Sequence, residues 1–260
     1  MKRYLYFLLI ISTVFCSCTN SKEYQDIKRD FQSVRYKEAD KSIIDSIVNE
    51  IPDNSLISEN INKLHKHFDK SLLLPVEDDI FCKNSKETAL KIGSYIANLG
   101  YIRHFEEVNL CFKYLEVVKT LSNKLAIASN LFDEFVPKFE EKIDNKVALF
   151  EFIDSLMNIG KYYFSDSEQY GLGALLLSGF WLECSYIGFS KNSINNKCEE
   201  IISSHFEILK HINNLLKEFE DNEIISRLKI TLLDLYNNKE NLEKTFADIT
   251  TYREELIFYQ

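Results

Sequence analysis

The stretch SKETALKIGSYIANLGYIRH, residues 85–104, decides the fold class. Its small residues recur at spacings of three and four, at Ala89, Gly93, Ala97 and Gly100. Larger apolar residues flank them, at Ile92, Tyr95, Ile96 and Leu99. Such spacing places residues on one face of an α-helix. Because small residues on a helix face let another helix come close, the stripe predicts a packing face.

The same helical spacing continues along the chain in both directions. Apolar stripes cover residues 43–51, 57–68, 105–125, 131–143, 147–163, 170–189, 201–216, 225–235 and 246–252. Pro52 ends the first stripe, a loop follows at 72–75, and Pro137 implies a kink or a helix start. Ser165, Asp166 and Ser167 supply an N-cap signal before the most apolar helix.

These patterns predict an all-α fold. No segment alternates polar and apolar residues over the length of a strand. Residues 39–260 are expected to form one domain of roughly eight to ten helices, a multi-helix bundle of antiparallel helical hairpins. The stripe at 105–125 should form such a hairpin with the helix that Ser85 precedes and that carries Ala89 to Gly100.

The N-terminus has the pattern of a bacterial lipoprotein signal peptide, expected to cover residues 1–17. Lys2 and Arg3 precede an apolar run that is too short for a membrane span. The following Cys16-Ser17-Cys18 resembles a lipobox, and Cys18 is the predicted lipidation site because small Ser17 precedes it. An ordinary signal peptide with incidental cysteines is the alternative.

Lipidation at Cys18 predicts that the protein is attached to a membrane, and it predicts the location of the protein in the cell. Acyl chains such as palmitate would hold the protein to a membrane, because each buried methylene contributes about 0.8 kcal/mol. Residues 18–38 would form the lipidated N-terminus and a polar tether. The expected location is the bacterial cell envelope, as an outer-membrane lipoprotein on its periplasmic or surface face.

The charge balance excludes nucleic acid as a partner. Removal of Lys2 and Arg3 with the signal lowers Lys+Arg from 31 to 29 against 40 Asp+Glu, so the net charge moves from −9 to −11. Such a surface repels phosphate backbones.

The sequence predicts no metal site, no cofactor and no catalytic residue. The cysteines after Cys18 are isolated in the sequence and lack the spacing of zinc ligands: Cys82, Cys111, Cys184 and Cys198. One long-range disulfide between two of them is possible. His104 with Glu107, and Glu207 with His211, have helical ligand spacing but lack the paired motifs of a di-iron bundle. Phosphate loops and nucleophile elbows are absent from the sequence.

Glu183 is the candidate polar or ligand-binding residue. It lies inside the apolar helix 170–189, which is long enough for a membrane span, but a carboxylate in mid-membrane is costly and favours a core helix. A buried carboxylate needs hydrogen-bond partners. Polar groups of the helix bearing Tyr95, Asn98 and Tyr101 are expected to supply them, with Gly93 and Gly100 allowing close approach. If the role is structural, Glu183→Gln should be tolerated.

Several blocks of this sequence resemble a family of uncharacterised helical lipoproteins of the Bacteroidetes. The blocks are Ile51-Pro52, KSLLLP (70–75), ALKIGSYIANLGY (89–101) and GFWLE (179–183). The family carries Asp where Asn98 stands, and no activity or ligand is attached to it. The resemblance therefore implies only a cellular location and a fold. A weaker resemblance links Gly93, Gly100, FEEV (105–108) and Phe112 to one tetratricopeptide-like hairpin.

Three functions fit these expectations. The first is a non-catalytic envelope protein that binds a partner protein or a small ligand on a concave, Tyr- and Phe-lined face. The second is a small-molecule binder or enzyme with a pocket around Glu183. The third is a structural component of the envelope.

Overall fold

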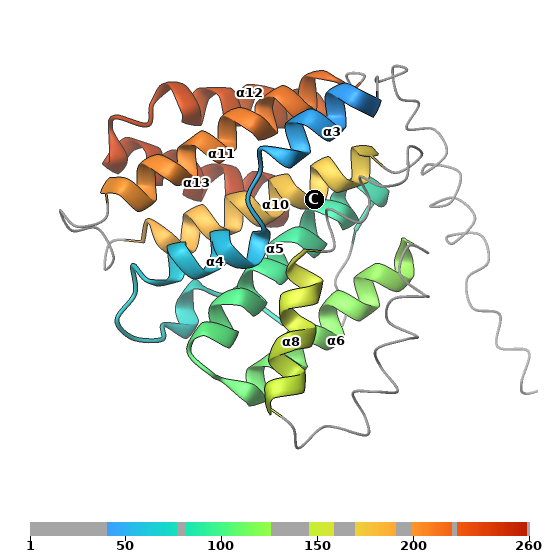
Figure 1. The fold of residues 1–260 in the computed structure, drawn as a ribbon, viewed down its shortest axis with the longest axis vertical. Coiled ribbons are helices and arrows are strands. Elements are labelled where there is room, and N and C mark those ends of the chain that lie inside the picture. Colours follow the sequence, from blue (N-terminus) through green and yellow to red (C-terminus); the bar gives the residue numbers. More distant parts are fainter. Residues whose placement is uncertain are drawn as a thin grey trace, which may run out of the picture.

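The computed structural model describes residues 41–76, 82–125, 146–158, 170–190, 199–219 and 223–258. Every regular element in these ranges is helical, which confirms the all-α prediction (Figure 1). Several predicted features lie outside the described residues: the signal peptide 1–17, the tether with Cys18, the stripe 131–143 with Pro137, the cap at 165–167 and Cys198.

The helices follow the apolar stripes of the sequence. Their bounds are α3 Lys41–Asn49, α4 Asn54–Asn62, α5 Ser85–His104, α6 Val108–Lys124, α8 Lys146–Met157, α10 Tyr170–Gly188, α11 Glu199–Lys217, α12 Glu223–Asn237 and α13 Leu242–Arg253. A 3₁₀ turn, η1, covers Lys70–Leu72, and a π-helical turn, η3, covers Glu254–Phe258.

Helix α5 begins at Ser85, directly after its polar cap residue Asn84. The Asn84 side chain accepts a hydrogen bond from the Glu87 amide at 2.9 Å, and the Glu87 carboxylate accepts one from the Lys83 amide at 2.9 Å. The first bond satisfies an amide group that the first turn leaves without a partner, and the second ties the residue before the cap to the same turn. Asn84 is therefore the cap, and Ser85 is the first helical residue.

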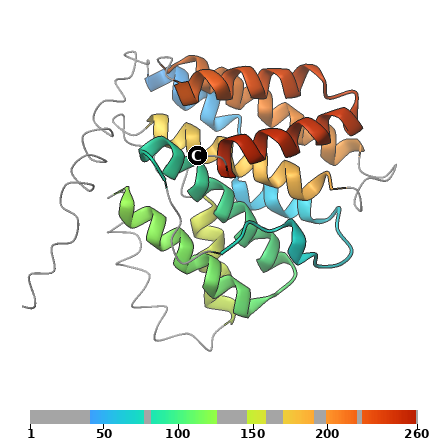
Figure 2. The ribbon, with the colours of Figure 1, turned by 180° about the vertical axis from the view of Figure 1, so that it is seen from behind.

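The centre of the molecule is the pair α5 and α10, which run in the same direction. The Ser94 hydroxyl contacts the Gly179 carbonyl at 3.1 Å, and one turn further the Asn98 amide contacts Glu183 at 2.6 Å. Both contacts join residues 85 positions apart, so the register advances in parallel (Figures 1 and 2). Because α5 and α10 are not consecutive in the chain, this parallel contact joins helices that do not belong to one hairpin.

Glycines let the two central helices touch through their backbones. A Cβ on Gly93 would lie 2.0 Å from the Leu176 carbonyl oxygen, and one on Gly179 would lie 2.1 Å from that of Leu90. Gly100, expected at the same contact, faces elsewhere, because its added Cβ would meet Ser58 of α4 and Met157 of α8. The small-residue stripe therefore serves two different helix contacts.

The remaining helices enclose this pair. Helix α6 packs on α5 as the predicted antiparallel hairpin, and α8 crosses α5 nearby (Figure 1). Helices α4, α11 and α13 cover α10, with α12 packed on α11 and α13. Among the described residues, α10 is long and apolar enough to cross a membrane, yet its apolar window is 94% buried inside the fold. It is a core helix of this domain.

Candidate functional site

Glu183 lies in the C-terminal half of α10, and its side chain is completely buried. One carboxylate oxygen accepts hydrogen bonds from Asn98 Nδ2 at 2.6 Å and from Arg253 Nη2 at 2.9 Å. The other accepts from Arg253 Nε at 2.6 Å. Glu183 and Arg253 thus form a two-pronged ion pair inside the core, with Asn98 as a third member.

Asn98 connects this ion pair to the loop segment before α5. Its Nδ2 also donates to the Ser94 carbonyl at 3.1 Å, and its Oδ1 accepts from the Leu74 amide at 2.7 Å. All polar atoms of the buried amide are therefore occupied. The side chain expected to hold Glu183 does so, and it fixes the position of residues 72–76 as well.

Arg253 was missed by the sequence reasoning, although a pattern for it exists. Phe246, Ile249 and Arg253 follow one another at spacings of three and four, which places the arginine on the apolar face of α13. Its guanidinium lies 3.8 Å from the centroid of the Tyr186 ring. Burial by itself lowers the pKa of Arg253, but the Glu183 carboxylate outweighs burial and the pKa is raised.

Tyr95 and Tyr101 were expected to help hold Glu183, but their hydroxyl groups form hydrogen bonds with other residues. The Tyr95 hydroxyl donates to the Pro75 carbonyl at 2.7 Å, while the Tyr101 hydroxyl accepts from the Asp69 amide at 2.8 Å. Both side chains point from α5 to residues 69–75. These tyrosines therefore position the loop segment, and Arg253 takes the place they were expected to fill.

Tyr114 of α6 completes the contacts to this segment. Its hydroxyl donates to the Leu74 carbonyl at 2.5 Å, so both backbone groups of Leu74 are held by side chains. Burial raises the pKa of Tyr114 to about 12, and the nearby Glu183 charge acts in the same direction. The ion pair is thus linked through Asn98 and Leu74 to Tyr114.

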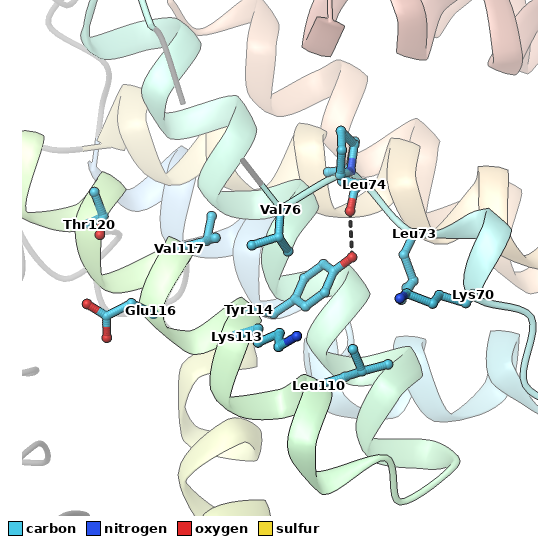
Figure 3. A pocket seen from close by; sticks show the side chains of 11 residues that line it. Lys70, Leu73, Leu74, Val76, Leu110, Lys113, Tyr114, Glu116, Val117 and Thr120 are labelled. Carbon is cyan, nitrogen blue, oxygen red and sulfur yellow. Dashed lines mark hydrogen bonds between the residues drawn. The ribbon is translucent and has the colours of Figure 1, made fainter. Parts of the chain in front are cut away.

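Tyr114 also lines an open pocket of about 690 Å³ between α6 and residues 70–76 (Figure 3). The volume lies within the range of roughly 300–1,000 Å³ typical of small-molecule sites. The lining residues are Lys70, Leu73, Leu74, Pro75, Val76, Leu110, Lys113, Tyr114, Glu116, Val117 and Thr120. Glu183 lines neither this pocket nor two smaller pockets of the described part of the chain. The pocket therefore lies one layer of structure away from Glu183, the residue around which a pocket was expected.

Polar groups stand at the two ends of this pocket. In Figure 3, Lys70 lies at one end of the pocket, and Glu116 and Thr120 lie at the other. The Lys113 ammonium group lies below the Tyr114 ring, with Leu73 and Leu110 on the Lys70 side and Val117 on the Glu116 side. The pocket is therefore amphipathic along its length.

A second buried polar group, centred on His205 of α11, was also missed. The Trp181 indole donates to the His205 carbonyl at 2.9 Å, and the two rings stack with centroids 4.9 Å apart. His205 Nε2 lies 2.8 Å from the Ser185 hydroxyl, which itself donates to the Trp181 carbonyl at 2.7 Å. Because that hydroxyl has one proton, Nε2 carries the ring hydrogen. Burial lowers the pKa of His205 to about 3, so the ring is neutral.

Metal and thiol chemistry finds little support in the described residues. No group of three His, Cys, Asp or Glu side chains there is arranged to hold a metal ion. Cys82, Cys111 and Cys184 carry free thiols in this part of the chain. Burial raises the pKa of Cys111 to about 12 and also raises that of Cys184, which makes both thiols unreactive.

Comparison of the chain with protein-family models, with curated proteins and with solved structures finds no significant match.

Proposed function

We propose that this protein is a lipid-anchored envelope protein whose helical domain is a non-catalytic binding module. Its binding site would be the pocket between α6 and residues 70–76. The observation that carries this proposal is the pocket itself, whose volume of about 690 Å³ suits a ligand or a side chain of a partner. The anchor is inferred from the signal-like residues 1–17 and Cys18.

The wall of the pocket supports this role because buried groups hold it in place. Leu74 is fixed on one side by Asn98 and on the other by Tyr114, and Pro75 is held by Tyr95. A wall that is ordered before the ligand arrives lowers the entropic cost of binding. The Glu183–Arg253 pair then acts as a structural support of the site.

A catalytic role for Glu183 is not favoured by its surroundings. Both carboxylate oxygens already accept hydrogen bonds from Asn98 and Arg253. A general acid or base must lie within hydrogen-bond reach of its substrate. No described pocket brings a substrate to this carboxylate.

Site-specific photo-crosslinking in the envelope tests the proposal. A benzophenone amino acid would replace exposed Thr120 in the pocket, and in a control chain it would replace Leu233 of α12, which is 50% exposed and distant from the pocket lining. We expect an adduct at Thr120 only, lost when Val76→Trp fills the pocket but kept when Ile230→Trp alters the surface of α12. Equal labelling at both positions, or none at Thr120, would refute pocket binding.

The anchor has its own test. Cys18→Ala should abolish incorporation of a fatty-acid analogue and release the protein from membranes. Labelling that persists on Cys16 would show that the cleavage site lies elsewhere.

A further inference from the structure

We infer that the pocket between α6 and residues 70–76 binds a small amphipathic monoanion, whose carboxylate lies between Lys70 and Lys113 and whose apolar body lies along the pocket. This inference rests on the proposed function and names the chemical class of the ligand. Three features of the pocket carry it: the two lysines, the apolar side chains around the Tyr114 ring and the acidic far end.

The two lysines come from separate elements. Lys70 comes from the 3₁₀ turn η1 and Lys113 from α6, and in Figure 3 their ammonium groups lie on two sides of the Tyr114 ring, Lys113 below it and Lys70 to its right. Among the described residues, neither ammonium has an ion-pair partner. In a chain of net charge −9, two cations that line the same pocket locally attract an anion.

The apolar side chains of the pocket offer contact to a ligand and no hydrogen bonds. Leu73 and Leu110 lie on the Lys70 side of the Tyr114 ring, and Val117 lies on the Glu116 side. The Tyr114 hydroxyl already donates to the Leu74 carbonyl, so the ring presents its apolar surface to a ligand. The body of the ligand is therefore apolar, and its polar group lies at an end.

The far end selects against a second negative charge. Glu116 lines the pocket there, beside the Thr120 hydroxyl. A dianion long enough to fill the pocket would bring its second carboxylate toward Glu116, and like charges repel. The ligand is therefore a monoanion, oriented with its charge toward the lysines.

Titration calorimetry with three ten-carbon probes tests this assignment. The protein is the full mature chain made as Cys18→Ala, so that no acyl chain of its own competes for the pocket. Decanoate carries the predicted charge, decanol lacks it, and decanedioate carries a second carboxylate at the other end. We expect decanoate to bind more tightly than either of the other probes.

Lysine variants identify the charged end. Lys70→Met and Lys113→Met keep most of the side-chain stem and remove the charge. Each should weaken decanoate binding by up to about fivefold, as expected for partly exposed charge pairs, and the double variant should weaken it roughly tenfold or more. Lys119→Met on the same helix lies outside the pocket lining and should leave binding unchanged. Decanol binding should not respond to any of the three.

The outcomes separate this inference from the proposed function. If decanoate fails to bind at millimolar concentration, or if decanol and decanedioate bind as tightly, the monoanion assignment is wrong. Adducts at Thr120 that Val76→Trp removes would still support pocket binding in that case. Tight binding to phosphatidylglycerol vesicles without binding of decanoate would also overturn the assignment, because the lysines would then recognise a membrane surface.

Discussion

At the scale of single residues, the Glu183–Asn98–Arg253 cluster is a balanced charge inside an apolar core. Removing two ions from water is costly, and only direct hydrogen bonds from the partner offset that cost. Here three bonds of 2.6–2.9 Å reach the carboxylate. Glu183 and Arg253 therefore depend on each other, because loss of either leaves the other buried without its counter-ion.

We predict that Glu183→Gln lowers the free energy of unfolding by about 3–5 kcal/mol, because it leaves the Arg253 guanidinium buried without its counter-ion. This reverses the expectation from sequence that the substitution is tolerated, which was made without Arg253. Replacing both ions, as in Glu183→Leu with Arg253→Met, should be less damaging than either single change. Urea denaturation of wild type, the two single variants Glu183→Leu and Arg253→Met and the double variant measures the coupling, and the same measurement on Glu183→Gln tests the predicted loss. A glutamine variant within about 1 kcal/mol of wild type would mean that the ion pair contributes little.

His205 gives the folded protein a sensitivity to acid. Burial lowers its pKa to about 3 from the ordinary 6.5, so between these values the unfolded chain binds a proton that the folded chain does not. Its contribution to stability is complete above pH 6.5 and is lost as the pH falls toward 3. From pH 7 to pH 5 that loss amounts to about 2 kcal/mol.

The non-titrating variant His205→Gln isolates this effect from the carboxylates. We predict that wild type loses about 2 kcal/mol more than His205→Gln when urea denaturation is repeated at pH 7 and pH 5. Equal losses in the two proteins would show that the imidazole does not titrate on unfolding in this range.

At the scale of elements, the fold depends on how closely α5 and α10 approach. The carbonyl of Leu176 occupies the space above Gly93, and that of Leu90 occupies the space above Gly179. A backbone carbonyl within a helix cannot move aside as a side chain can. The two glycines are therefore fixed by the helix–helix distance, although glycine in a helix interior costs roughly 1 kcal/mol relative to alanine.

Gly93→Ala should consequently destabilise the protein by about 1–3 kcal/mol or more, because the helices must separate to admit the methyl group. Gly100→Ala is the matched comparison on the same helix. Its added Cβ would meet the Ser58 hydroxyl at 2.2 Å, a group that can rotate away, and the gain in helix propensity offsets part of the cost. Thermal unfolding of both variants tests the order. A Gly100 variant that is the less stable of the two contradicts the assigned contact.

The helices themselves were predictable from sequence, and their partners were not. Apolar spacing located α5 and α10 because periodicity is a local property of the chain. The register that pairs Asn98 with Glu183 and the arrival of Arg253 from 70 residues away depend on contacts that no local pattern encodes. Gly93 was correctly placed at a close contact, whereas Gly100 was assigned to the wrong neighbour because a stripe does not say which helix it faces.

At the scale of the whole molecule, the end of the chain returns to its centre. Helix α13 lies against α10 (Figure 2). Its last residue, Arg253, contacts both Glu183 of α10 and the Leu72 carbonyl through its guanidinium. Ile249 and Ile257 are buried beside it. The last helix thus closes the core and supplies the charge that Glu183 needs.

We predict that deleting residues 242–260 abolishes cooperative unfolding. Burial of the two isoleucines contributes about 1.5–3 kcal/mol each, and the unpaired Glu183 costs about 3–5 kcal/mol more. Their sum is comparable to the whole stability of a typical domain, about 5–15 kcal/mol. Arg253→Met, which keeps α13 and removes only the charge, should unfold cooperatively at a lower temperature. Calorimetry of both proteins separates the two contributions, and a truncated chain that melts like wild type would show that the core closes without its last helix.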